Sequence, residues 1–136
     1  MDRSASLKTK LVRIFLWAAR INILKPLVLY FFKHMERFLP IERLFENEHW
    51  LAFEHPQPAY PLHLLLLPKK PIPSLMETPL ESPEFYRDLM AAVKALVQRY
   101  DLETRGYRLI TNGGPNQSIP QWHWHLISET PGDVND

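Results

Sequence analysis

The sequence predicts an α+β domain in which one main helix covers a mostly antiparallel, five-stranded sheet. Three strand-like segments lie between residues 41 and 68, a segment with helical periodicity follows over residues 82–100, and two more strand-like segments come after it. Strands joined by short turns, with one helix inserted among them, favour antiparallel pairing. The 136 residues are enough for one domain with a hydrophobic core.

The first three strands are predicted from apolar runs and from the turns that separate them. Residues 41–46 and 50–54 are expected to pair as a hairpin around a turn at residues 47–49. Residues 55–61 are expected to form a loop, because three prolines interrupt regular structure there. The continuous apolar run over residues 62–68 is typical of a central strand that is buried on both faces.

The helix is predicted from its start signal and its apolar period. Ser82 is a favourable N-cap residue, Pro83 fits the first turn, and Glu84 complements the positive end of the helix dipole. Six apolar or aromatic residues recur at helical spacing: Phe85, Leu89, Val93, Leu96, Val97 and Tyr100. We therefore expect a helix that packs one side on the sheet and ends near residue 99.

The last strand, predicted over residues 121–128 after a fourth strand at residues 107–111, alternates between polar and apolar side chains. The odd positions are Gln121, His123 and His125, and the even positions are Trp122, Trp124 and Leu126. Since successive side chains of a strand point to opposite faces, the amide and both imidazoles are expected to share one face. The polar turn before this strand can bring backbone N–H groups, Asn112 and Ser118 to the same face, which suits an anion such as a phosphate.

This last segment resembles the signature of the histidine triad (HIT) family of nucleotide-binding hydrolases and transferases. The signature is three histidines separated by single apolar residues after a Gln-Ser lead, and here Gln121 stands in place of the first histidine. The similarity covers about residues 41–129. It extends to three further stretches of that range: residues 51–53, 63–72 and 107–112. The resemblance implies a HIT-like sheet with one main helix.

The resemblance also implies the chemistry of the site. The neutral imidazole of His123 would attack a phosphorus atom, and water would then hydrolyse the covalent nucleotidyl-histidine. The groups expected to hold phosphate oxygens are His125, Gln121 and Ser118, with Asn112 binding the phosphate or supporting the turn. Gln117 and His63 are expected to line the site. The implied ligand is a nucleotide or nucleotide conjugate, the implied assembly is a homodimer, and no cofactor or metal is required.

Two positions bear on the nucleoside rather than on the phosphate. The acid that the family carries in its ribose-facing loop is replaced here by His55. Phe53 can line a nucleobase slot, although the same position would also serve as core. The nucleoside preference therefore does not follow from the resemblance.

Other interpretations of the histidines remain open from the residues alone. His123 and His125 can be a structural pair whose ring nitrogens are satisfied internally. Together with His63 they can also supply three zinc ligands, although the resemblance favours phosphate chemistry. Because Gln121 can donate to an oxygen but cannot shuttle a proton, a catalytically weak nucleotide-binding or interaction module is the alternative function.

The composition excludes several classes of function. The chain has no cysteine, which rules out disulfides, thiolate nucleophiles and cysteine-based zinc sites. The net charge of +1 predicts no polyanionic partner, and neither a P-loop nor a nucleic-acid-binding motif is present. The remaining aromatic pair of the last strand, Trp122 and Trp124, is expected in the core or at a subunit interface.

The N-terminal third differs from the rest in charge. Residues 1–43 hold nine Lys/Arg and three Asp/Glu, whereas residues 44–136 hold seven and twelve. Residues 1–40 are predicted to be a basic, apolar helical extension of a HIT-like domain at residues 41–129, with a flexible tail at residues 130–136. Residues 11–38 hold five Leu, four Phe and one Trp but are interrupted by basic residues and a proline.

Such a segment favours peripheral contact with a membrane surface over a spanning helix. Packing on the domain or on a partner is the alternative. A cytoplasmic location, with possible contact to the inner membrane surface, follows from this interpretation.

Overall fold

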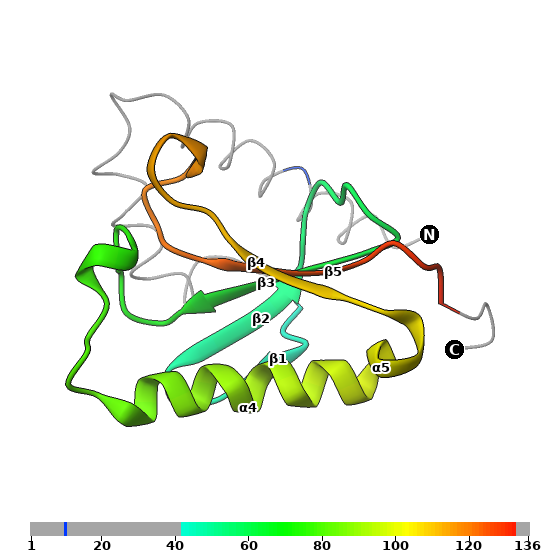
Figure 1. Ribbon diagram of the computed structural model, residues 1–136, viewed down its shortest axis with the longest axis horizontal. Helices are drawn as coiled ribbons and strands as arrows, with labels where there is room; N and C mark the ends of the chain where they lie inside the picture. The colour runs from blue at the N-terminus through cyan, green and yellow to red at the C-terminus, as the bar shows by residue number, and fades with distance from the viewer. Residues whose placement is uncertain (1–9, 11–41, 133–136) are drawn as a thin grey trace.

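The computed structural model describes residue 10 and residues 42–132 (Figure 1). Its strands are β1 (Phe45–Glu46), β2 (Trp50–Glu54), β3 (Leu62–Pro68), β4 (Arg108–Thr111) and β5 (Trp124–Ser128). Its helices are α4 (Pro83–Arg99) and α5 (Leu102–Arg105), with 3-10 turns η2 (Leu75–Glu77) and η3 (Gly114–Asn116). The α+β class is confirmed. The predicted N-terminal extension falls outside the described residues except for residue 10.

The five strands form a single sheet in the order β1-β2-β3-β5-β4, and every neighbouring pair is antiparallel. The predicted antiparallel sheet is therefore confirmed. The apolar run of β3 lies at its centre, and the six residues from His63 to Pro68 are all buried, as a strand covered on both faces should be. The expected homodimer stays a prediction.

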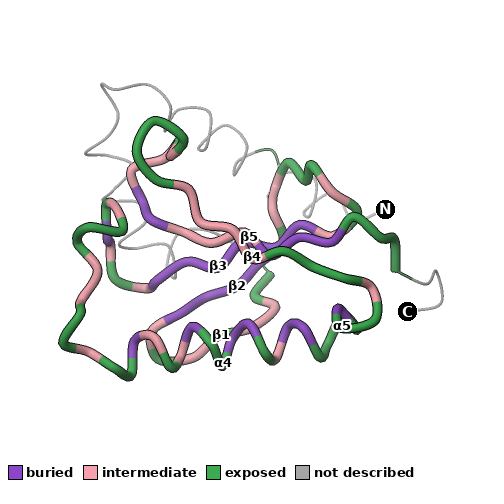
Figure 2. Tube along the Cα trace, in the orientation of Figure 1, coloured by how far each residue is buried: buried purple, intermediate pink, exposed green. Residues whose placement is uncertain are grey.

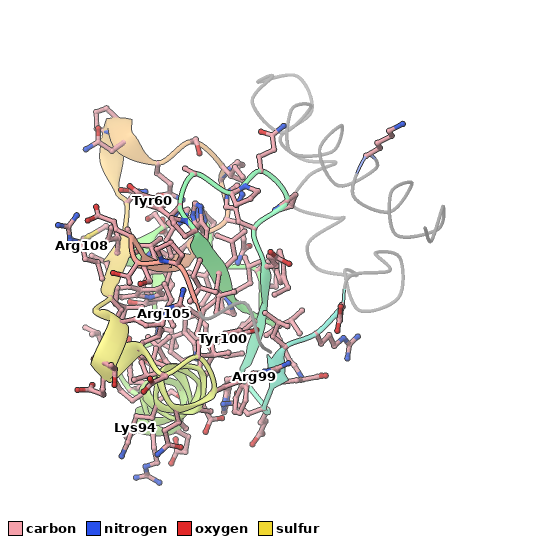
Figure 3. All side chains as sticks on the ribbon, turned by 90° about the vertical axis from the view of Figure 1, so that its right-hand side faces the viewer. Tyr60, Lys94, Arg99, Tyr100, Arg105 and Arg108 are labelled. Carbon is pink, nitrogen blue, oxygen red and sulfur yellow. The ribbon has the colours of Figure 1, made fainter. Side chains whose placement is uncertain are left out.

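One face of the sheet carries the main core and is covered by α4 (Figure 1). The helix buries Phe85, Leu89, Ala92, Val93, Leu96 and Val97, and its turns alternate between buried and exposed segments in Figure 2. Figure 3 looks along α4 and shows Lys94 on the side away from the sheet. The indole Nε1–H of Trp50, on β2, donates to the carbonyl of Phe85 at 2.8 Å, which joins the sheet to the first turn of the helix.

The opposite face of the sheet carries a second apolar cluster next to polar loops. Leu51, Phe53, Leu65 and Leu67 form this cluster on β2 and β3. The loop after β2 and the loop before β5 rise on the side away from α4 (Figure 1), and Tyr60 of the first loop lies there in Figure 3. This face therefore combines an apolar floor with loop backbone, an arrangement that suits a ligand.

The turn between β1 and β2 is bonded to α4. The Asn47 side-chain oxygen accepts from the N–H groups of His49 and Trp50 at 3.2 and 2.9 Å. Its amide donates to the Asp88 carbonyl at 2.8 Å. The His49 ring nitrogen Nδ1 lies 2.6 Å from an Asp88 carboxylate oxygen. His49 is half-buried in this network.

Several element bounds differ from the prediction. Strand β1 pairs with β2 over only two residues, Phe45 and Glu46, and β5 begins at Trp124 rather than at residue 121. Ser82 is the N-cap of α4 as predicted, although its side chain makes no capping hydrogen bond. Thr130, at the start of the expected flexible tail, accepts two hydrogen bonds from the Arg105 guanidinium at 2.7 and 3.2 Å.

Candidate active site

The predicted histidines lie on the sheet face away from α4. Phe53, Leu65, His125 and Ile110 stand directly opposite one another across β2, β3, β5 and β4. Residues opposite one another in a ladder share a face, so His125 lies in line with the apolar cluster. His63, two residues before Leu65 on β3, is on the same face. The predicted proximity of these residues is therefore observed.

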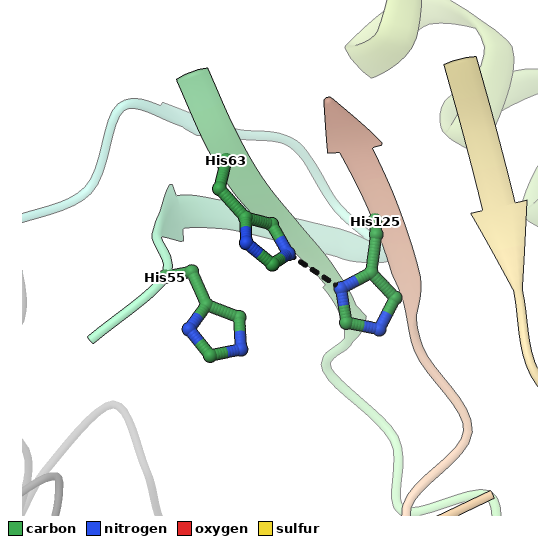
Figure 4. A group of neighbouring side chains, drawn as sticks. All are labelled: His55, His63 and His125. Carbon is green, nitrogen blue, oxygen red and sulfur yellow. Dashed lines mark hydrogen bonds between the residues drawn. The ribbon is translucent and has the colours of Figure 1, made fainter. Parts of the chain in front are cut away.

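Four imidazole rings contact one another in sequence, and we call His123, His125, His63 and His55 the imidazole array. The ring centres of His123 and His125 are 4.9 Å apart, and those of His125 and His63 are 5.1 Å apart. The His55 ring is stacked on His63 at 4.2 Å, with 26° between the ring planes. Figure 4 shows His55, His63 and His125 together on one side of the strands.

Hydrogen bonds fix which nitrogen of His63 and of His125 carries the proton. The backbone N–H of Ala59 lies 3.1 Å from Nδ1 of His63. An N–H group can only donate, so this Nδ1 is the acceptor and the proton of the neutral ring is on Nε2. That Nε2–H lies 2.9 Å from Nδ1 of His125. His125 must accept through Nδ1, which places its own proton on Nε2.

His123 has the opposite arrangement. Its Nδ1 lies 2.7 Å from the backbone carbonyl oxygen of Gln121. A carbonyl oxygen can only accept, so Nδ1 carries the proton and Nε2 keeps its lone pair. The site therefore combines an imidazole with a nucleophilic Nε2, His123, and a neighbouring imidazole with a donating Nε2–H, His125.

Gln121 contributes through its backbone in this structure. Its side chain is only 1% exposed, and its oxygen accepts from the Ile72 N–H at 3.3 Å. The Trp122 N–H donates to the Ile72 carbonyl at 2.7 Å, so residues 121 and 122 are bonded to residue 72, and β5 begins only at residue 124. Of the three side chains expected to share a face, only that of His125 lies within β5, and that of Gln121 is buried and bonded to residue 72.

The loop before β5 holds the remaining predicted residues. Asn112 follows β4 and is half-buried, whereas Ser118 is exposed. The side-chain amide of Gln117 donates to the carbonyls of Pro73 at 2.6 Å and Ile119 at 2.9 Å. Gln117 therefore holds the loop against the segment after β3. Its amide nitrogen is occupied by these two hydrogen bonds, whereas we expected the residue to line the site.

Comparison with known proteins identifies the family of this chain. The HIT domain profile matches residues 37–132, more than half of the chain. The chain belongs to the HIT family. An uncharacterised HIT-like protein of Synechococcus elongatus is 35% identical over 99 residues, which cover 71% of this chain and 86% of that protein.

Solved structures of HIT proteins share the fold. A HIT family hydrolase from Legionella pneumophila superposes with a TM-score of 0.66 at 29% identity and covers 77% of this chain and 96% of its own. A histidine triad nucleotide-binding protein from Candida albicans gives a TM-score of 0.64 at 25% identity. The aligned region covers 79% of this chain and 85% of that protein. The five-stranded sheet with one main helix is thus the HIT fold.

Burial in this HIT domain site favours the neutral form of His123, His125 and His63. Burial, followed by the positive charges that His123, His63 and His55 would carry, lowers the pKa of His125 to about 3. Burial also lowers the pKa of His123, although its bond to the Gln121 carbonyl acts in the opposite direction. Burial lowers the pKa of His63. A neutral His123 is the form that can attack an electrophile.

These pKa shifts predict that the free energy of unfolding falls as the pH is lowered from 7 towards 4. The ordinary histidine pKa is 6.5, and that of folded His125 is about 3. Between these values the unfolded chain binds a proton that the folded chain does not, so this stability is complete above pH 6.5 and is lost as the pH falls towards 3. Urea denaturation at a series of pH values measures the slope.

The matched variant for this pH measurement is His125→Asn, whose side-chain oxygen can still accept from His63. We expect a shallower loss of stability with acid in the variant than in the wild type. Equal slopes in the two proteins would contradict a depressed pKa at His125.

The described residues contain two groups with the composition of a metal site, and in both of them ring nitrogens already take part in hydrogen bonds. The first group is His55, His63 and His125. Each of them has one ring nitrogen that lies within 4.8 Å of a ring nitrogen of the other two. However, Nδ1 of His55 accepts from the Gln57 N–H at 2.9 Å and Nδ1 of His63 accepts from Ala59. Each Nε2 therefore carries a proton, so a metal would have to displace a proton or a backbone hydrogen bond.

The second such group, Glu48, His49 and Asp88, lies at the turn between β1 and β2. There Nδ1 of His49 is bonded to the Asp88 carboxylate. That the HIT domain works without a metal stays a prediction.

Proposed function

We propose that this HIT domain is a nucleotide phosphohydrolase or nucleotidyl transferase that acts through a covalent intermediate on His123. The observation that carries the proposal is the opposite proton placement on two adjacent imidazoles. Nε2 of His123 has a lone pair, while Nε2 of His125 has a proton, and each is set by a hydrogen bond on the other side of its ring. Substrate in this site would meet a nucleophile and a donor at once.

The chemical step follows from these two groups. Nε2 of His123 attacks the phosphorus and forms an N–P bond, while the bond between phosphorus and the leaving group breaks and the leaving group departs with its electron pair. Nε2–H of His125 donates to a phosphoryl oxygen, whose negative charge it stabilises in the transition state. Water then attacks the phosphorus of the nucleotidyl-histidine and forms a P–O bond, while the N–P bond breaks with its electron pair returning to Nε2 of His123 and the water's proton passes to solvent. In a transferase, an acceptor hydroxyl takes the place of water.

The other predicted residues have supporting roles in this proposal. Ser118 and Asn112 lie on the loop that precedes β5 and supply polar groups for phosphate oxygens. Gln117 holds that loop against residue 73, and Gln121 orients His123 through its carbonyl. Phe53 belongs to the apolar cluster that continues the row from His125, which supports an apolar base or leaving group over that floor.

The similar proteins support the same class of reaction. The Legionella protein is described as a HIT family hydrolase, and the Candida protein is described as a nucleotide-binding protein. Both share the fold of this chain. Since a fold alone does not decide an activity, the proposal depends on the site geometry and takes from these relatives only the class of ligand.

The intact mass of the protein after brief exposure to an adenosine phosphoramidate or a dinucleoside polyphosphate tests the intermediate. The reaction is quenched without acid, because a phosphoramidate bond is acid-labile. We expect an added nucleotidyl group in the wild type and none in His123→Ala. If neither protein gains mass with any nucleotide and no turnover is seen, the chain is the nucleotide-binding or interaction module instead.

We also infer that residues 11–38 contact a membrane surface, although they lie outside the described residues. The support is their mixture of basic and large apolar side chains. No helix in the described ranges is long and apolar enough to cross a membrane. Deleting residues 1–38 should abolish sedimentation with vesicles of anionic lipid while adduct formation continues. Equal sedimentation of both proteins would reject membrane contact through this segment.

A further inference from the structure

His123, the proposed nucleophile, lies just before the point where the sheet begins. The pairing of β4 with β5 ends at Thr111 and Trp124, and the pairing of β3 with β5 ends at Leu66 and Trp124. The backbone of His123 is therefore outside both ladders. Because chain segments without ladder bonds open easily, other hydrogen bonds must keep this residue in place.

The segment around His123 is bonded both to the stretch after β3 and to β4. The Trp122 N–H donates to the carbonyl of Ile72, which follows β3, at 2.7 Å. The hydroxyl of Thr111, the last residue of β4, donates to the His123 carbonyl at 2.8 Å. The first bond joins two backbone groups and is open to almost any residue type, whereas the second depends on one side chain.

The side chain of Thr111 lies on the face of the sheet away from the imidazole array. Thr111 stands opposite Trp124 in the ladder, and residues opposite one another share a face. Trp124 packs against the main core, whereas His125, the next residue, points to the other face. Thr111 therefore cannot touch a substrate bound at the imidazoles, and its effect on the reaction must pass through the backbone of His123.

We propose that Thr111 is a positioning residue whose hydroxyl holds the backbone of His123 and thereby directs Nε2 of that ring at the phosphorus. The inference rests on the proposed function and names a residue that the chemical step itself does not use. The His123 ring is bonded to the Gln121 carbonyl through Nδ1 at 2.7 Å, so a shift of this backbone moves the ring. A displacement of about 1 Å in a reacting group can lower a rate about 100-fold.

The place of Thr111 in the chain gives its bond a second consequence. Thr111 directly precedes Asn112, which is proposed to supply a polar group for phosphate oxygens. The hydroxyl of Thr111 therefore joins the start of the phosphate loop to the residue that attacks the phosphorus. One hydrogen bond can in this way set the distance between the two.

The other end of the same strand pair provides a matched control. There the hydroxyl of Ser128 donates to the Gly106 carbonyl at 2.7 Å, just beyond the last pair, Arg108 and Ile127. Ser128 joins the end of β5 to the stretch before β4, as Thr111 joins the end of β4 to the stretch before β5. Since Ser128 is buried and Thr111 is only half-buried, loss of the Ser128 hydroxyl should destabilise the fold at least as much.

The rate of adduct formation at saturating nucleotide tests the inference in Thr111→Val, Thr111→Ser and Ser128→Ala. Val has nearly the shape of Thr without the hydroxyl, and Ser keeps the hydroxyl. We expect the rate to fall about tenfold or more in Thr111→Val and the affinity for AMP, measured by isothermal titration, to stay within about twofold. The other two variants should keep the wild-type rate within about threefold. Urea denaturation measures the stability of each protein.

A second measurement needs no turnover. Long-range ¹⁵N–¹H NMR spectra at about pH 8, where histidine is neutral, show which ring nitrogen of His123 carries the proton. In the wild type the bond to the Gln121 carbonyl places it on Nδ1. A ring that leaves this carbonyl can carry its proton on either nitrogen, so Thr111→Val should show a mixture of the two forms. Thr111→Ser and Ser128→Ala should match the wild type.

Two kinetic results would overturn the inference. One is a wild-type rate of adduct formation in Thr111→Val. The other is an equal loss of rate in Ser128→Ala, which would assign the effect to the stability of the strand pair. If the wild type forms no adduct with any nucleotide, the proposed function fails and the NMR spectra decide the inference. A mixture of proton positions in Thr111→Val would then still support it, and a proton that stays on Nδ1 would overturn it.

Discussion

Replacing His123 with Asn should lower the turnover of a nucleotide substrate by a factor of about 10⁴ or more, a loss typical of removing a nucleophile. In the wild type the Gln121 carbonyl lies 2.7 Å from Nδ1 of His123. The Asn side-chain amide can donate to the same carbonyl, so the local backbone should stay in place. What is lost is the lone pair at Nε2, for which Asn has no equivalent. Steady-state kinetics and a thermal melt of both proteins measure the two effects separately.

Added imidazole provides the control for this prediction. In His123→Gly the missing side chain leaves a space next to the Nε2–H of His125, and imidazole from the buffer can enter it and attack the same phosphorus. Turnover should then rise with imidazole concentration in the Gly variant and not in the wild type. A His123→Asn variant that keeps more than a tenth of the wild-type turnover would show that another group attacks the phosphorus.

The sheet and helix were predictable because each local pattern agrees with the fold. The run of leucines in β3 has both faces buried, and the apolar stripe of α4 packs on the sheet as its spacing indicates. The start of β5 was not predictable in the same way. Trp122 pairs its N–H with Ile72, a residue outside any strand, so the polar and apolar alternation of the sequence begins before the strand does.

The site was predictable in its side chains and not in its proton positions. His123 and His125 carry a recognisable spacing, and His63 was expected beside them. The proton positions depend on the backbone N–H groups of Ala59 and Gln57 and on the backbone carbonyl of Gln121. Almost any residue type can supply these groups, so the sequence contains no signal for them and only the folded loops reveal them.

The second large effect concerns the core, where Trp50→Ala should lower the free energy of unfolding by about 3–5 kcal/mol. Trp50 is fully buried, and its ring lies 5.0 Å from Phe85 and 5.7 Å from Trp122, centre to centre. Truncation removes these contacts, leaves a cavity between β2 and α4, and deletes the Nε1–H donor to Phe85. Urea denaturation measures the change.

Leu80→Ala is the control for the core prediction, because Leu80 is an apolar residue that is 88% exposed and should change stability by no more than about 0.5 kcal/mol. The Trp50 variant should also form the nucleotidyl adduct at temperatures well below its melting point. Trp50 lies on the α4 face of the sheet, whereas the imidazole array lies on the other face and takes its proton positions from loop backbone. A loss of stability below about 1 kcal/mol would contradict the packing between β2 and α4. A folded Trp50 variant without the adduct would show instead that the two faces are coupled through β2.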